Sequence, residues 1–91
     1  MLLKKIKFLD DYKIQCQFTT KETVIWNAKK SLIRNRPIWN TLKEESNFKN
    51  LHIEDGVLVY RFSDEENDYF DICPDLIYME GKSCRYQSLI L

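Results

Sequence analysis

Glycine and proline are scarce in this sequence, which has two residues of each among its 91. Such a composition excludes collagen-like and low-complexity chains, and it favours short connections between regular elements. The chain has one histidine, His52, and its three cysteines form no C-x-x-C pair, so a zinc site would have few ligands. No apolar run reaches the length of a signal peptide or a membrane span. We therefore expect a cytoplasmic protein with reduced thiols that binds no metal, no cofactor and no membrane.

Apolar residues make up 44% of the sequence and aromatic residues 13%, which is enough for the core of one small domain over residues 1–91. Charge is unevenly divided, since residues 1–50 hold eleven Lys and Arg against five Asp and Glu, whereas residues 51–91 hold three against nine. The two halves could lie side by side and neutralise each other. Alternatively, they could form a polarised surface with a basic face for an acidic partner.

The N-terminal third predicts a meander of three strands. From position 12 to 19, apolar and polar residues alternate, which is typical of a sheet with one buried and one solvated face. Shorter runs at 5–8 and 22–26 supply the flanking strands. The residues expected to point into the core from the central strand are Tyr12, Ile14, Cys16 and Phe18.

Two short helices are predicted next. Asn27 can cap the first helix, which ends before Pro37 because the residue that precedes a proline is displaced from helical geometry. The second helix runs from about Pro37 to about position 45 and breaks at 46–47, after which Phe48 returns to the core. The residues expected on the buried faces are Ala28, Leu32, Ile33, Ile38, Trp39 and Leu42.

The C-terminal half predicts a hairpin and a further strand. The dipeptide Asp55-Gly56 supplies the turn of the hairpin between 51–53 and 57–62. The segment 57–60 is apolar on both faces, as in an interior strand covered by helices. A last short strand is expected at 69–72.

A final helix is expected from Pro74 to about position 80, ended by Gly81 and followed by a C-terminal tail at 82–91. The sequence therefore predicts the α+β class. We expect two layers: a largely antiparallel sheet of five or six strands, with two or three short helices on one face.

The sharpest motif is the stretch Asp71-Ile72-Cys73-Pro74-Asp75-Leu76-Ile77-Tyr78. Pro74 suits the first position of a helix, and Asp75 complements the helix dipole in the first turn. The stretch resembles the D-(I/L)-C-P-(D/E)-x-(L/I)-Y ending of small bacterial proteins in domain-of-unknown-function family 2442. The similarity covers residues 4–80 through two further segments, at 12–18 and 37–42. A tryptophan and a glycine that relatives often have before the motif are missing here.

The resemblance implies no settled biochemical activity. It does imply a genomic habit, because family members often lie beside genes of another small family in an arrangement that looks like a toxin–antitoxin pair. A small toxin-like protein encoded nearby would then be the partner of this chain.

Cys73 is the one thiol whose position suggests chemistry, since a helix N-terminus stabilises a thiolate. No base accompanies it, however, and the carboxylates of Asp71 and Asp75 oppose a negative charge on sulfur. We therefore expect Cys73 to be a buried structural cysteine. A thiol enzyme built on Cys73 is the least favoured of three functional hypotheses.

Other polar residues have structural interpretations. His52 has no identifiable partner for acid–base chemistry and is expected at the surface. The acidic run Asp64, Glu65, Glu66 and Asp68 lacks the spacing of a calcium loop, so we expect a solvated loop. The Tyr78 hydroxyl is expected to meet a backbone or carboxylate partner at the edge of the core.

Two segments are candidates for binding. One is a basic cluster that could contact carboxylates of a protein partner or, if it shares one helix face, three or four phosphates. It consists of Lys29, Lys30, Arg34 and Arg36. The other is the apolar end of the tail, which would add to a sheet edge or lie on a partner, including a second copy. It consists of Leu89, Ile90 and Leu91.

The leading hypothesis is a non-enzymatic protein-binding module, which could be the antitoxin-like member of a two-gene pair and could form a homodimer. The alternative hypothesis is a nucleic-acid-associated regulator that uses the basic helix face. The two hypotheses share the same cations and differ in the chemistry of the partner.

Overall fold

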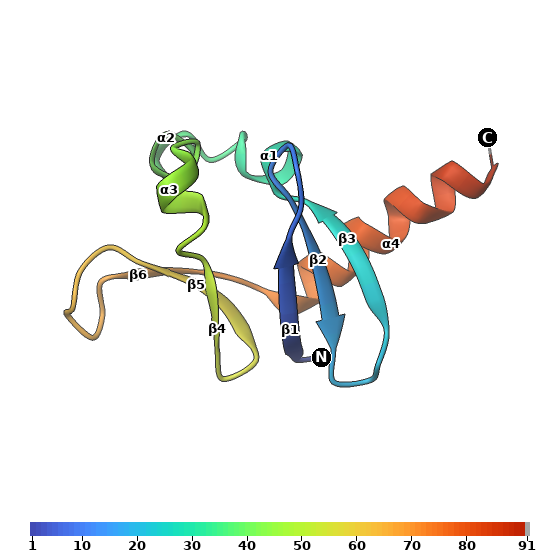
Figure 1. The fold of residues 1–91 in the computed structure, drawn as a ribbon, viewed down its shortest axis with the longest axis horizontal. Helices are drawn as coiled ribbons and strands as arrows, with labels where there is room; N and C mark the ends of the chain where they lie inside the picture. The colour runs from blue at the N-terminus through green and yellow to red at the C-terminus, as the bar shows by residue number, and fades with distance from the viewer. Residues whose placement is uncertain (91) are drawn as a thin grey trace.

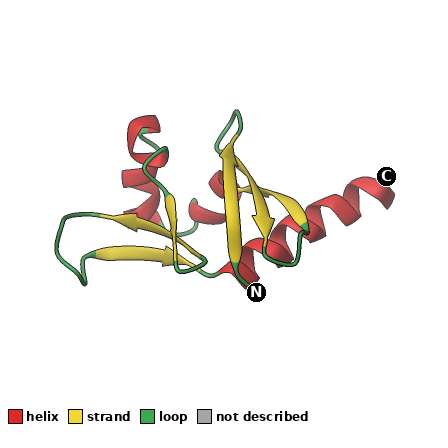
Figure 2. Ribbon diagram, turned by 60° about the horizontal axis from the view of Figure 1, so that its bottom comes forward, coloured by secondary structure: helices red, strands yellow, loops and turns green. Residues whose placement is uncertain are grey.

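The computed structural model describes the backbone of residues 1–90 and the side chains of residues 1–82. This part of the chain forms two three-stranded antiparallel sheets and four helices (Figures 1 and 2). The elements follow one another as β1 (Leu3–Phe8), β2 (Lys13–Phe18), β3 (Thr23–Asn27), α1 (Ala28–Leu32), α2 (Arg36–Leu42), α3 (Glu45–Phe48), β4 (His52–Glu54), β5 (Val57–Arg61), β6 (Tyr69–Ile72) and α4 (Pro74–Ile90). The α+β class is as predicted, whereas the prediction of one sheet with five or six strands is wrong.

The first sheet is the predicted meander, with β2 between β1 and β3. The alternation of β2 places Ile14, Cys16 and Phe18 inside, each with 0% exposed surface. Tyr12 belongs to the preceding turn and not to the strand, because Asp11 and Tyr12 both have a φ of 59°. Its ring is half-buried and still packs against the core.

The second sheet has β5 in the middle, between β4 and β6. The Asp55-Gly56 turn is as predicted, and the two φ angles of 51° and 80° suit the twisted two-residue turn of a hairpin. Leu58 and Tyr60 of β5 face the core, whereas Val57 and Val59 face away from it. The prediction that helices cover both faces of 57–60 is therefore wrong, because the second face borders a surface cavity.

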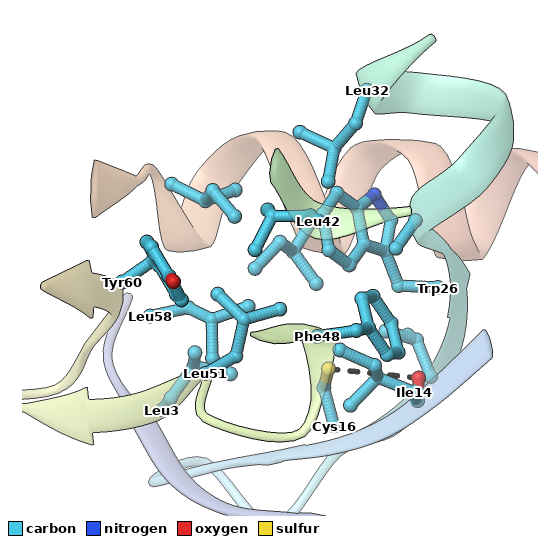
Figure 3. Packing of buried hydrophobic residues seen from close by; sticks show 14 of the residues in the cluster. Leu3, Ile14, Cys16, Trp26, Leu32, Leu42, Phe48, Leu51, Leu58 and Tyr60 are labelled. Atoms are coloured by element: carbon cyan, nitrogen blue, oxygen red, sulfur yellow. Dashed lines mark hydrogen bonds between the residues drawn. The ribbon is translucent and has the colours of Figure 1, made fainter. Parts of the chain in front are cut away.

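The two sheets meet through a shared core and not through a continuous ladder of strands. β1 approaches the β4–β5 turn, where the Leu3 amide donates a hydrogen bond to the Gly56 carbonyl at 2.8 Å. Figure 3 shows side chains of both sheets, such as Ile14 and Leu58, packed in one cluster. Alternation in the sequence identified the buried face of β2, but it carries no information on which strand edges pair across the fold.

Helices α1 to α3 connect the two sheets. The Asn27 side chain caps α1 as predicted, accepting a hydrogen bond from the Lys30 amide at 3.1 Å. Ala28 and Leu32 are buried, but Ile33 follows the end of α1 and is 50% exposed, so its assignment to the core was wrong. The break expected at 46–47 is also wrong. The chain forms a third short helix there, which delivers Phe48 to the core.

Helix α4 runs through Gly81 and continues to Ile90, so the predicted stop at Gly81 and the separate tail are wrong. Gly81 is instead a point of close approach to β3, because a Cβ atom there would lie 2.7 Å from Val24 Cγ2 and 3.2 Å from the Ile25 carbonyl oxygen. The helical conformation of a glycine costs about 1 kcal/mol relative to alanine. Packing of α4 against β3 offsets that cost. The side chains of Leu89, Ile90 and Leu91 lie outside the described residues.

Two hydrogen bonds tie α4 to β3 and to the turn before it. The indole Nε1 of Trp26 donates to Glu80 Oε1 at 2.8 Å, and the Tyr78 hydroxyl donates to Glu22 Oε2 at 2.7 Å. The expectation of a carboxylate partner for Tyr78 is therefore confirmed. Its ring packs edge-on against Phe18, with 5.5 Å between the ring centroids.

We predict that Gly81→Ala lowers the free energy of unfolding by about 1–3 kcal/mol, because the new methyl group overpacks the contact with Val24 and this outweighs the gain in helix propensity. Denaturant unfolding measures the effect. In the smaller Val24→Ala background the same substitution should cost less, which a double-mutant cycle detects. Met79→Ala on the exposed side of α4 is the matched control. A stabilising Gly81→Ala would contradict the close approach.

Candidate functional site

The outer face of the second sheet carries a network of three charged or titratable side chains. Arg61 binds the Glu54 carboxylate through two atoms, with Nε 2.7 Å from Oε2 and Nη2 2.8 Å from Oε1. His52 Nε2 lies 2.6 Å from the same Oε2, and its Nδ1 lies 2.9 Å from the Asn50 carbonyl oxygen. Such a two-atom pair fixes both side chains more firmly than a single exposed ion pair does.

The geometry of the hairpin explains why these side chains meet. His52 and Glu54 are two positions apart in β4 and therefore point to the same face. Arg61 lies on that face of β5, beyond the residue that pairs with His52. His52 is exposed, as expected, but the absence of a partner was wrong. The sequence contained evidence for this contact, because residues at positions i and i+2 of a strand, such as His52 and Glu54, point to the same face.

A cavity of about 300 Å³ lies beside this network on the same face. Its floor is formed by Val57 and Val59, of which Val59 is only 5% exposed. Tyr69 of β6 forms a wall, and the Arg61 guanidinium lies 5.4 Å from the centroid of its ring. The remaining lining residues are Arg61 itself, Asn67 and four acidic residues, Glu54, Asp55, Glu66 and Asp71.

The network shifts the pKa values of its members in opposite directions. The hydrogen bonds from Arg61, and then the contact with His52, lower the pKa of Glu54 to about 2. The pKa of His52 is raised above its ordinary value of 6.5, because the Asn50 carbonyl and then the Glu54 carboxylate accept hydrogen bonds from the charged imidazole. The Glu54 pair therefore contributes stability above the unfolded pKa of 4.5 and loses it as the pH falls toward 2. The His52 contribution is complete below pH 6.5 and is lost as the pH rises through its folded pKa.

The predicted basic cluster lies elsewhere, along the connection from α1 to α2 (Figure 1). Its cations do not share one helix face, because Lys29 and Lys30 belong to α1, Arg34 to the turn, and Arg36 to the start of α2. All four are exposed, and within the described residues none of them forms an ion pair or a side-chain hydrogen bond. Exposed Ile33 lies among them in the sequence. We call these four cations and Ile33 the basic surface.

The motif that begins at Asp71 is only partly as expected. Cys73 is exposed, so the prediction of a buried structural cysteine is wrong. The deeply buried thiol is Cys16, whose pKa burial raises to about 12. Pro74 is buried at the start of α4, and Asp75 lies 3.6 Å from the N-terminal amine of Met1. The prediction failed because Cys73 is the single residue between the end of β6 and the start of α4, and its side chain is exposed between the buried Ile72 and Pro74.

The acidic loop after β5 is solvated as expected, with its carboxylates at Asp64, Glu65 and Glu66 all exposed. Ser63 Oγ donates to Asp68 Oδ2 at 2.7 Å, and Arg61 Nη1 donates to the Glu66 carbonyl at 3.3 Å. Among the residues described, no group of three or more His, Cys, Asp and Glu side chains could hold a metal ion. No helix in the described part of the chain combines the length and apolarity needed to span a bilayer.

No family model, curated protein or solved structure matches this chain. The resemblance to domain-of-unknown-function family 2442 therefore stays a prediction, and the site must be interpreted from its own geometry.

We predict that Arg61→Gln raises the pKa of Glu54 toward 4.5, by roughly one unit or more, because the carboxylate loses the two-atom hydrogen bond. The pKa of His52 should stay above 6.5 as long as Glu54 is ionised. Carbon-13 NMR of the carboxyl groups and proton NMR of the imidazole follow both titrations. Arg34→Gln, which removes the same charge from the basic surface, is the control and should leave Glu54 unchanged.

We also predict that an aromatic disulfide reagent modifies Cys73 in the folded protein and spares Cys16 until the chain unfolds. A Cys84→Ser background removes the third thiol, and intact-protein mass spectrometry counts the adducts. One adduct before denaturation and two after it are expected. Protection of Cys73 in the folded protein would contradict its exposed position.

Proposed function

We propose that this chain is a non-enzymatic, cytoplasmic protein-binding module that contacts an acidic partner through the basic surface. The observation that carries the proposal is a short segment in which four exposed, unpaired cations flank one exposed isoleucine in the sequence. Lys29, Lys30, Arg34 and Arg36 have no counter-charges among the described residues, and Ile33 is 50% exposed. A partner that supplies carboxylates and an apolar contact would satisfy both features.

The short helices favour a protein partner over nucleic acid. Because the four cations are distributed over α1, a turn and α2, they do not form the continuous stripe along one helix that would follow a phosphate backbone. The aromatic residues in the half of the chain that holds these cations are buried or half-buried and offer bases little surface: Phe8, Tyr12, Phe18, Trp26, Trp39 and Phe48. Membership of a two-gene pair, with a small toxin-like protein as the partner, belongs to the same proposal.

The test begins with a tagged chain in its native host and mass spectrometry of proteins that co-purify at stoichiometric amounts. Lys30→Glu combined with Arg34→Glu should weaken that complex by roughly tenfold or more, because cations at an interface become like charges. Lys5→Glu combined with Lys7→Glu changes the net charge equally on the outer face of β1 and is the matched control. Equal loss in both double variants would contradict a specific role of the basic surface.

A second variant separates the apolar contact from the charges. Ile33→Ser should change the free energy of unfolding by no more than about 0.5 kcal/mol, since the side chain is half exposed, yet it should weaken the complex. Calorimetric titration with the purified partner measures the affinity. Recovery of nucleic acid in place of protein, with binding that declines steeply in salt, would overturn the proposal in favour of the regulator hypothesis.

A further inference from the structure

The outer face of the second sheet is a second candidate surface, and acidic residues line it, in contrast to the cations of the basic surface. It combines the cavity of about 300 Å³, the valine floor and the wall formed by Tyr69. β6 borders the cavity and is the edge strand of its sheet, with no strand paired to its other side in the described part of the chain. An edge strand next to a lined cavity is suited to an extended segment of another chain.

The charged groups on this face determine whether it favours a cationic or an anionic ligand. Arg61 lies in the cavity wall, but both of its outer nitrogen positions are used by Glu54 and by the Glu66 carbonyl. In contrast, the carboxylates of Asp55, Glu66 and Asp71 accept no hydrogen bond and form no ion pair among the described residues. The available charge is therefore negative, so an anion such as a phosphate would be repelled.

The uncharged part of the cavity selects the shape of the ligand. Lys and Arg side chains have an apolar stem that can lie on Val57 and Val59 while the charged head reaches the carboxylates at the border. The Tyr69 ring is partly exposed and already has one guanidinium over it, at 5.4 Å from its centroid, so the ring can hold a cation at this border of the cavity. A cavity of about 300 Å³ can accommodate a side chain of this size, but it is small for a folded element.

We infer that this face docks an extended, Lys- or Arg-bearing segment of a partner protein along β6. Backbone pairing with the free edge of β6 would set the register, and alternate side chains of the segment would point over the outer face. The cations would then meet Asp71 on β6 and Glu66 at the border. This docking surface uses none of the residues of the basic surface, so it stands independently of the function proposed above.

The test uses a short capped peptide that alternates lysine and threonine, titrated into the nitrogen-15-labelled full chain. Amide signals of Val57, Val59 and Tyr69 should shift in a saturable manner, and the affinity should decrease with added salt. Asp71→Asn combined with Glu66→Gln should weaken binding by roughly tenfold, at about threefold for each exposed carboxylate. Both residues are exposed, so the variant should stay folded. The dispersion of its amide signals verifies this.

The matched control is Asp64→Asn combined with Glu65→Gln, which removes the same charge from the loop that contains Glu66, at positions outside the cavity lining. This variant should bind the lysine peptide within about twofold of the parent chain. Equal weakening by both double variants would reduce the effect to general attraction and overturn the inference. Shifts on the basic surface, equal binding of a peptide that alternates glutamate and threonine, or self-association through this face would also overturn it.

Discussion

The shared core between the two sheets is the constraint on which the rest of this structure depends. A three-stranded sheet buries one face only if another layer covers it, and neither sheet has a complete layer of its own. Leu3 from β1 and Leu58 from β5 therefore enter the same cluster as Phe48 from α3. Because one core serves both sheets, the outer face of each remains at the surface, where polar and charged residues can be placed without loss of packing.

Helix α4 packs against β3, an edge strand of the first sheet. The contact depends on the small size of Gly81, which lets the helix approach Val24, and on the hydrogen bond between Trp26 and Glu80. Trp26 is fully buried, so its indole N–H would be costly to leave without an acceptor. The long reach of α4 away from the sheets is evident in Figures 1 and 2.

The distribution of charge follows from the same architecture. Seven of the eleven Lys and Arg residues of the first half lie on β1 or along the segment from α1 to α2, whereas four of the nine Asp and Glu residues of the second half line the cavity on the second sheet. The formal charge of zero is therefore the sum of an excess of six cations in the first half and an excess of six anions in the second half. Ion pairs within the described residues form inside one half of the chain, such as Glu54 with Arg61, except for the pair between the Met1 amine and Asp75.

The sequence by itself determined the local elements, because alternation, capping and turn chemistry act between neighbouring residues. It was sufficient for the meander, the Asn27 cap, the Asp55-Gly56 turn and the burial of Ile14, Cys16 and Phe18. Only the tertiary structure decided that the strands divide into two sheets, that α4 continues through Gly81, and that Cys73 and Ile33 are exposed. The division into two sheets and the course of α4 depend on contacts between residues far apart in the chain, such as Gly81 with Val24, whose packing outweighs local preference.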